Sequence, residues 1–217
     1  MQTIKRVTKK QSSCARAFAV SLIKGLRGAM KEKYIFDIRL VGSVKWNTII
    51  KMPNELWDVD YQILLTNNSP VYINNGFSNP TKIKEDFFNY FNISFQKKKG
   101  FVVQNSTTSI TIINKNSGYS LDFVIIKDGK YIIRRNNNDK SGKNMYTWNQ
   151  LPKYTKAYEK FMELDPDEKE YLIEKFILPY KIKEKKKSAG DPSKKSSYEI
   201  FIEVVNNYVA RKRNNRL

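Results

Sequence analysis

Apolar residues recur at every third or fourth position over residues 12–33, which is the spacing of one buried face on an α-helix. Ser12 or Ser13 would cap the start of this helix. A second helix is predicted over residues 79–91, with Asn79 as its cap and Pro80 in its first turn. The apolar face of the first helix consists of Ala15, Phe18, Ala19, Leu22, Ile23 and Leu26.

Short runs of alternating or continuous apolar residues predict β-strands in the first two thirds of the chain. Residues 115–118, Lys-Asn-Ser-Gly, are a good turn signal, so the strands on either side should form a hairpin. Residues 136–144 are rich in asparagine and glycine and predict a loop. The predicted strands are 34–43, 57–66, 100–104, 109–114, 119–129 and 130–136.

The pattern changes after Trp148. Residues 151–183 are amphipathic and predict helix, residues 184–197 are a polar, basic linker that we expect to be mobile, and residues 197–217 predict a final helix with a basic tail. We therefore expect an α+β protein. A small mixed β-sheet backed by helices would form residues 1–150, and a helical C-terminal region would form residues 151–217.

The composition permits a packed core and excludes several kinds of chemistry. Apolar residues make up 40% of the 217 residues, including 12 Phe. No apolar run approaches the roughly 20 residues that span a bilayer, and no signal-peptide core follows the basic N-terminus. The single cysteine, Cys14, rules out an internal disulfide, so we expect a soluble, cytoplasmic protein with no membrane partner. The absence of histidine excludes His-dependent triads and His-ligated zinc sites.

The formal net charge is +19, from 40 Lys and Arg against 21 Asp and Glu. A positive field of this size attracts polyanions such as nucleic acids. The alternative cause is an AT-rich genome, which enriches a sequence in lysine and asparagine. Both explanations leave the protein surrounded by the same positive field.

Two aspartates, Asp58 and Asp60, alternate within the predicted strand 57–66, so both side chains should point to the same face of the sheet. Asp122 lies within the apolar strand 119–129, where an unpaired charge is costly. A divalent cation between these carboxylates would remove their repulsion, and Mg²⁺ or Mn²⁺ suits oxygen ligands. Two such ions stabilise the attacking and leaving oxygens of a phosphoryl transfer. The alternative is that Asp58 and Asp60 are ordinary turn or solvent-facing residues.

The order of these residues resembles the DNA polymerase beta superfamily of nucleotidyltransferases, over about the first 150 residues. The matching residues are Gly42-Ser43, then Asp58-Val59-Asp60 on a strand, then Asp122 on a later strand. The resemblance implies a small mixed sheet backed by helices, and two metal ions on the three aspartates. It also implies a Gly-Ser turn at a helix start that holds the nucleotide's phosphates. Backbone N–H groups there and the Ser43 hydroxyl suit a triphosphate on physical grounds as well.

Within that superfamily the chain looks most similar to the bacterial cyclic-oligonucleotide synthases (CD-NTases) and their animal relatives. These enzymes have a Lys or Arg and a Thr soon after the Gly-Ser pair, and here these residues are Lys45 and Thr48. The segment Trp148–Pro152 resembles another of their segments more weakly. The chain departs from this branch in length, because those enzymes usually carry a larger helical lobe.

Basic residues outside this motif are candidates for contacts with phosphates. Lys45 would neutralise charge on the triphosphate. Four further residues are predicted to bind a nucleic-acid backbone, and the alternative for each is an ordinary solvated charge. These four residues are Arg134, Arg135, Lys97 and Lys98.

The sequence therefore predicts a nucleotidyltransferase that moves a nucleoside monophosphate from a nucleoside triphosphate to an acceptor hydroxyl, which Asp122 would help to deprotonate. The excess of positive charge favours RNA or another polyanion as the acceptor, and a protein partner would complete the acceptor site. One alternative is a synthase of cyclic or linear oligonucleotide signals in antiphage defence. Another is a non-catalytic nucleic-acid-binding module, for which three converging carboxylates would serve no purpose.

Overall fold

The computed structural model describes residues 4–71, 77–135, 145–151, 156–188 and 190–214. The chain forms two compact units. The sheet unit consists of Thr8–Asn47 and Asn54–Leu151, and the helical unit of Met1–Val7, Thr48–Pro53 and Pro152–Leu217. The domain division expected after residue 150 stays a prediction, because compactness does not test independent folding. The predicted loop 136–144 lies outside the described residues.

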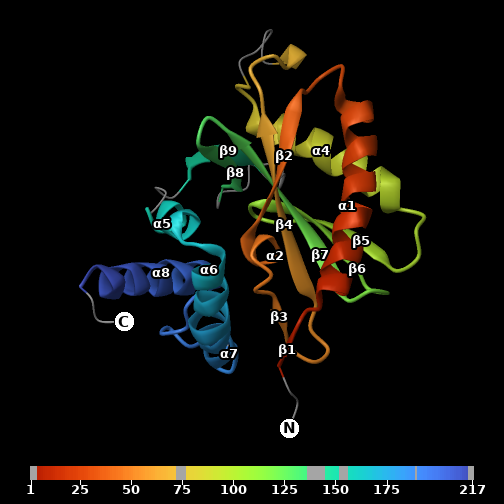
Figure 1. The fold of residues 1–217 in the computed structure, drawn as a ribbon. Helices are drawn as coiled ribbons and strands as arrows, with labels where there is room; N and C mark the ends of the chain where they lie inside the picture. Colours follow the sequence, from red (N-terminus) through yellow and green to blue (C-terminus); the bar gives the residue numbers. More distant parts are fainter. Residues whose placement is uncertain (1–3, 72–76, 136–144, 152–155, 189, 215–217) are drawn as a thin grey trace. The chain divides into compact units, whose positions relative to one another are not determined.

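The sheet unit is built on a mixed β-sheet (Figure 1). Its strands follow in the order β2, β4, β7, β6, β5, while β8 pairs with the end of β7 and β9 pairs with β8. Strands β4 and β7 are parallel, and the other neighbours are antiparallel. The strands are β2 (Phe36–Val41), β4 (Trp57–Leu65), β5 (Phe101–Asn105), β6 (Ser109–Asn114), β7 (Tyr119–Lys127), β8 (Lys130–Arg134) and β9 (Tyr146–Gln150).

Two helices, α1 (Lys9–Met30) and α4 (Pro80–Phe95), pack against this sheet through aromatic rings. The ring of Phe18 on α1 lies 6.5 Å from the ring of Tyr119 on β7. The ring of Phe91 on α4 stacks on Phe123 of β7 at 5.0 Å. Tyr119 and Phe123 have the same parity on β7, so both helices cover one face of the sheet.

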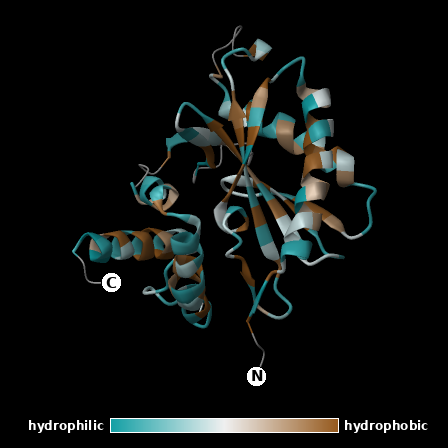
Figure 2. Cartoon of the chain, in the orientation of Figure 1, coloured by the Kyte–Doolittle hydropathy of each residue, from teal (hydrophilic) through white to brown (hydrophobic). Residues whose placement is uncertain are grey.

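The alternation of side chains along β4 determines which residues point to the face opposite the helices. Trp57, Val59 and Tyr61 are buried on the side of the helices. The residues between them, among them Asp58 and Asp60, must therefore point to the other face. Figure 2 shows apolar residues along the strands of the sheet and hydrophilic residues on the turns that join them.

The helical unit contains a short sheet and a group of helices. Its two strands, β1 (Lys5–Arg6) and β3 (Ile50–Lys51), are antiparallel. Lys181 is buried at 4% exposure and donates its Nζ to the carbonyl of Thr48 at 2.6 Å, which connects the helices to the segment before β3. None of the described helices of either unit is long and apolar enough to cross a membrane. The helices are α5 (Ala157–Glu163), α6 (Pro166–Leu172), the π-helical turn η1 (Ile173–Ile177), α7 (Leu178–Lys185) and α8 (Ser197–Arg213).

Most of the predicted elements are confirmed. The Asn79 side chain caps α4 by accepting from the backbone N–H of Lys82, and Pro80 occupies the first turn. The expected cap of the first helix is wrong, because Thr8 caps α1 and shares a capping box with Gln11. Strand β9 was not expected at all.

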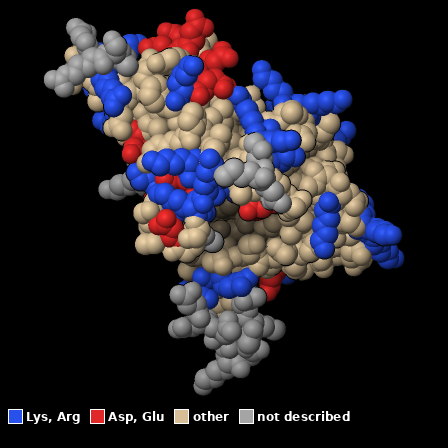
Figure 3. Space-filling view, turned by 90° about the horizontal axis from the view of Figure 1, so that it is seen from below, with Lys and Arg blue, Asp and Glu red and all other residues tan. Residues whose placement is uncertain are grey.

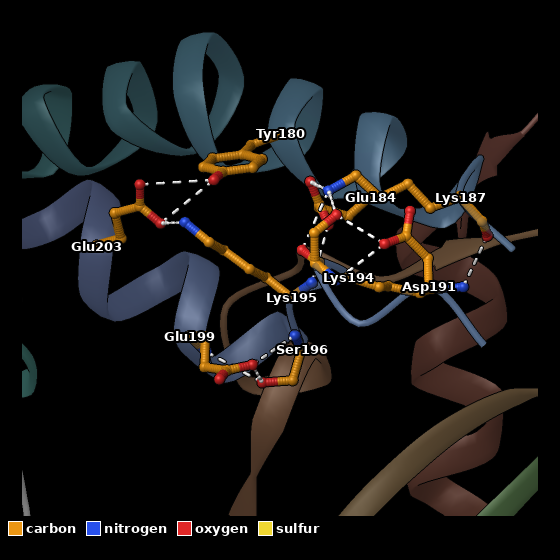
Figure 4. Close-up of polar contacts among 10 residues, drawn as sticks. Tyr180, Glu184, Lys187, Asp191, Lys194, Lys195, Ser196, Glu199 and Glu203 are labelled. Atoms are coloured by element: carbon orange, nitrogen blue, oxygen red, sulfur yellow. Dashed lines mark hydrogen bonds and ion pairs between the residues drawn. The ribbon is translucent and has the colours of Figure 1, made fainter. Parts of the chain in front are cut away.

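The C-terminal predictions are confirmed in part. The helical character expected over 151–183 is present as α5, a break at residues 164–165, and then α6, η1 and α7, which follow one another without interruption. The linker expected to be mobile is crossed by hydrogen bonds, because the backbone N–H of Lys195 donates to Glu184 at 2.8 Å and Lys194 Nζ donates to the carbonyl of Lys187 at 3.0 Å (Figure 4).

Candidate active site

The three predicted aspartates lie on one face of two neighbouring strands. Asp58 and Asp60 alternate on β4, and Asp60 is directly opposite Asp122 in the parallel register with β7. Asp58 is opposite Ser120 in the same register. Residues opposite each other in a sheet point to the same face, so all three aspartates project from the face that α1 and α4 leave uncovered.

Gly42 brings the Gly-Ser turn against this acidic face. It begins α2 (Gly42–Lys45), directly after Val41, which is opposite Asp60 in the pairing of β2 with β4. Gly42 has φ +67°, and a Cβ atom at this position would lie 2.1 Å from Oδ2 of Asp60. Both the backbone conformation and the contact therefore require glycine here.

Hydroxyl groups hold two of the three carboxylates. Ser120 Oγ donates to Oδ1 of Asp58 at 2.7 Å. Thr111 Oγ1 donates a short hydrogen bond to Oδ1 of Asp122, and Ser109 Oγ approaches the same oxygen at 3.5 Å. Thr111 is opposite Asp122 in the antiparallel register of β6 and β7, so the hairpin itself places this donor.

The surroundings of Asp122 disfavour its negative charge. Burial raises the pKa of the Asp122 carboxyl, and the nearby charge of Asp58 raises it too, whereas the hydrogen bonds from Thr111 and Ser109 lower it. The net direction is upward. A cation bound beside Asp58 and Asp122 would reverse this direction, because opposite charge favours the ionised form.

The donor set fits a hard divalent cation in its chemistry, because all three donors are carboxylates on one face of the sheet. The charge of Asp58 is one of the causes that raise the pKa of Asp122, and a bound cation would offset it. However, among the described residues no group of three or more His, Cys, Asp or Glu side chains is gathered closely enough to hold a metal ion. Each of Asp58 and Asp122 instead accepts hydrogen bonds from hydroxyls, so the metal ligands stay a prediction.

The predicted nucleotide ligands are divided between the two units. Ser43 and Lys45 are on α2 with Gly42, beside the acidic face, and Lys45 Nζ lies 4.9 Å from the centre of the Trp46 ring. Thr48 is only 4% exposed and belongs to the helical unit, where its carbonyl accepts from Lys181. A contact of Thr48 with a nucleotide stays a prediction that the described contacts do not favour.

The predicted nucleic-acid contacts are on separate elements of the sheet unit. Lys97 and Lys98 are exposed after the end of α4, and Arg135 is exposed after β8. Arg134 points into the protein, where its guanidinium donates to the carbonyl of Asn105 and lies over the ring of Tyr146. Arg134 therefore has a structural role in this structure. Lys and Arg side chains are nevertheless spread over much of the face shown in Figure 3.

A buried lysine near the site was not expected from the sequence. Lys84 on α4 is 1% exposed, and its Nζ donates to the carbonyls of Ser106 at 2.9 Å and Thr107 at 3.4 Å. These carbonyls belong to the turn between β5 and β6, and Ser106 Oγ lies 3.3 Å from Thr111 Oγ1. Lys84 thus holds the turn whose strand supplies the donor to Asp122.

No protein-family model matches the chain, and no curated protein matches it by sequence. Solved structures match its fold. The c-di-GMP synthase CdnE of Capnocytophaga granulosa aligns with a TM-score of 0.60 and 17% identity, over 93% of this chain and 61% of that one. The cyclic AMP-GMP synthase DncV of Vibrio cholerae, solved with the linear intermediate pppA(3′,5′)pG, aligns with a TM-score of 0.57 and 10% identity, over 80% of this chain and 47% of that one.

A third solved structure, a complex of CdnC with a HORMA protein from E. coli MS115-1, aligns with a TM-score of 0.54 and 15% identity over 93% of this chain. The chain spans from 47% to 61% of the lengths of these three proteins. The similarity is one of fold. It confirms the expected α+β architecture and, at the level of the fold, the resemblance to cyclic-oligonucleotide synthases.

Proposed function

We propose that the protein is a metal-dependent nucleotidyltransferase that joins nucleotides into cyclic or linear oligonucleotides. The observation that carries the proposal is the placement of Asp58, Asp60 and Asp122 on one face, beside the turn that begins at Gly42. The fold supports it, because the sheet that holds these residues is shared with solved synthases of cyclic dinucleotides.

In this proposal each residue has a defined role. Gly42 and Ser43 lie at the triphosphate, where glycine permits close approach of the backbone and the hydroxyl donates a hydrogen bond. Asp58, Asp60 and Asp122 would hold Mg²⁺ or Mn²⁺, which supplies neutralisation of phosphate charge and a lower pKa of the acceptor hydroxyl. Asp122 accepts the proton of the acceptor hydroxyl. The hydroxyl oxygen then forms a bond to the α-phosphorus, and pyrophosphate leaves with the electrons of the broken P–O bond.

The acceptor in the proposal is the hydroxyl of a second nucleotide. The earlier expectation of an RNA acceptor depended on net charge alone, and the comparisons do not support it. The neighbouring structures are synthases that couple nucleotides to one another, and one of them was solved with a linear dinucleotide intermediate. A role in antiphage defence stays a prediction.

A protein partner also belongs to the proposal. The CdnC neighbour was solved in complex with a HORMA protein. The chain spans about three fifths of CdnC. In the proposal, a partner protein provides contacts to the acceptor nucleotide that the remaining part of such a synthase would otherwise provide.

The test incubates the protein with labelled nucleoside triphosphates, singly and in pairs, with Mg²⁺ or Mn²⁺ and with or without RNA. We expect soluble oligonucleotide products and pyrophosphate without RNA. The variant with both Asp58→Asn and Asp60→Asn should lose at least about a hundredfold in rate, since it removes ligands for the phosphate-neutralising ions. Asp37→Asn is the matched control, because Asp37 is an exposed carboxylate on β2 and its loss should not change the rate.

Two results would contradict the proposal. Full activity of the double variant would remove the aspartates from the mechanism. Label that appears only in added RNA would return the assignment to nucleic-acid modification, with the same three residues in the same roles.

A further inference from the structure

A groove in the helical unit is lined by none of the residues of the acidic face and is not used by the proposed reaction. It has a volume of about 410 Å³ and runs between η1–α7 on one side and α8 on the other. This volume is in the range of small-molecule sites. The apolar and aromatic part of its lining consists of Leu172, Phe176, Pro179, Tyr180, Val204 and Tyr208.

One end of the groove is braced by a polar network (Figure 4). Glu203 on α8 accepts a hydrogen bond from Tyr180 on α7 at 3.3 Å and forms an ion pair with Lys195. The hydrogen bond to Glu203 raises the pKa of Lys195, and the hydrogen bond to Tyr180 raises it as well. The only acid of the lining is thus already neutralised by a cation.

Three cations of the lining have no such partner. The side chains of Lys175, Lys183 and Arg211 make no hydrogen bond or ion pair with any described residue, and all three residues are exposed. The exposed amide of Asn207 lies in the lining without a hydrogen bond to a described residue as well. An apolar floor with uncommitted positive charge at its edges is complementary to a ligand that combines a ring with an anionic group.

We propose that this groove binds a small aromatic anion, with its ring against Phe176 and Tyr180 and its acidic group paired with Arg211, Lys175 or Lys183. A second copy of the chain is disfavoured as occupant, because each copy carries +19 and the groove's cations would face further positive charge. A nucleic-acid strand would use the cations and leave the apolar floor without a partner. The ligand that uses both features is small, aromatic and acidic.

The test uses the dye anilinonaphthalene sulfonate, an aromatic sulfonate whose fluorescence rises in an apolar site. Titration of the 217-residue protein at low salt should show one saturable site, and phenyl phosphate should displace the dye. Inorganic phosphate and phenol at the same concentration should not displace it, because each lacks one of the two required features. Displacement by either of them to the same extent would overturn the proposal, and so would displacement by RNA or an acidic peptide but not by phenyl phosphate.

Variants locate the binding. Arg211→Glu should weaken dye binding by at least about fivefold, since attraction becomes repulsion at short range in partly desolvated surroundings. Arg213→Glu makes the same charge change on the same helix outside the groove lining and should alter binding by less than about twofold. Phe176→Ala should also weaken binding by at least about fivefold through loss of the ring contact. Equal effects of Arg211→Glu and Arg213→Glu, or unchanged binding in Phe176→Ala, would overturn the assignment.

This proposal is independent of the proposed reaction. The variant with Asp58→Asn and Asp60→Asn changes only the sheet unit and should bind the dye as the unaltered protein does. Failure of the dye experiment would therefore leave the nucleotidyltransferase assignment unaffected, and loss of that activity would leave the groove unaffected.

Discussion

The buried amine of Lys84 should make the stability of the sheet unit depend on pH in a direction that few lysines produce. Burial is the main cause that lowers the pKa of Lys84 from 10.5 to about 7, and the charge of Arg134 is the second cause. The side chain is 1% exposed, so water does little to offset the cost of its charge. In the unfolded chain the same amine returns to its ordinary pKa.

The sign follows from proton binding. Between about pH 7 and about 10.5 the unfolded chain holds a proton on Lys84 that the folded chain lacks, so the free energy of unfolding rises with pH. The limiting slope is about 1.4 kcal/mol per pH unit, and the full difference corresponds to about 5 kcal/mol. Between about pH 7.5 and about 9.5 we expect a gain of about 2–3 kcal/mol. Below about pH 7 the contribution is constant.

Lys84→Met removes the ionisable group and keeps the length of the side chain. We expect the gain with pH to disappear in this variant, because methionine has no proton to lose. The variant also leaves the carbonyls of Ser106 and Thr107 without this donor, which costs about 1–3 kcal/mol at every pH. The slope with pH is therefore the quantity that tests the reasoning.

The assay is urea unfolding followed by tryptophan fluorescence at constant ionic strength. All three tryptophans, Trp46, Trp57 and Trp148, belong to the sheet unit, so the signal reports on the unit that contains Lys84. Lys97→Met is the matched control, since it makes the same substitution at an exposed lysine of the sheet unit. Equal slopes in the unaltered protein and Lys84→Met, or no slope in the unaltered protein, would refute the argument.

Two further predictions concern the acidic face. Gly42→Ala should destabilise the sheet unit by about 1–3 kcal/mol in urea unfolding and reduce nucleotidyl transfer, because φ is +67° and the new Cβ would displace Asp60. Gly28→Ala in α1 is the control and should be neutral or stabilising, because a Cβ there meets nothing within 4 Å. Equal effects of the two substitutions would contradict this prediction. Thr111→Val should raise the pKa of Asp122, because the lost hydrogen bond favoured the ionised carboxylate. The acidic limb of the pH–rate profile should therefore move to higher pH. An unshifted limb would show that Thr111 does not set the pKa of Asp122 in the reaction.

The positions of the aspartates could be predicted because they depend on local geometry. A strand has a side-chain period of two, so Asp58 and Asp60 had to share a face once the strand was recognised. Glycine at position 42 was expected for close approach of the backbone to a phosphate, whereas the structure shows a positive φ and a contact with Asp60 that both require glycine.

The hydroxyl partners were missed for different reasons. The position of Thr111 could have been predicted from the sequence. The turn 115–118 pairs Asn114 with Tyr119, and counting outward along the hairpin places Thr111 opposite Asp122. Ser120 was not within reach, because its approach to Asp58 depends on the parallel register of two strands separated by a helix and a hairpin. Such a register is set by packing of the whole sheet and leaves no local signal.

The burial of Lys84 was missed because a lysine in an amphipathic helix ordinarily extends its amine to water. Here the carbonyls of the turn between β5 and β6 meet that amine inside the protein. The groove in the helical unit was missed as well, since it depends on how α8 packs against η1 and α7. The sequence pattern showed only that each of these segments has an apolar face.

Lys84 and Thr111 belong to one chain of contacts, but we expect Lys84 to affect stability and Thr111 to affect the reaction. Lys84 Nζ donates to the carbonyl of Ser106, the hydroxyl of Ser106 contacts that of Thr111, and Thr111 donates to Asp122. Thr111 is also fixed by the ladder between β6 and β7, which does not depend on Lys84. Lys84→Met should therefore remove the pH dependence of stability and leave the acidic limb of the rate profile in place. Thr111→Val should shift the acidic limb of the pH–rate profile and leave the pH dependence of the free energy of unfolding unchanged. If either variant changed both quantities, the turn between β5 and β6 and the carboxylate of Asp122 would be structurally coupled.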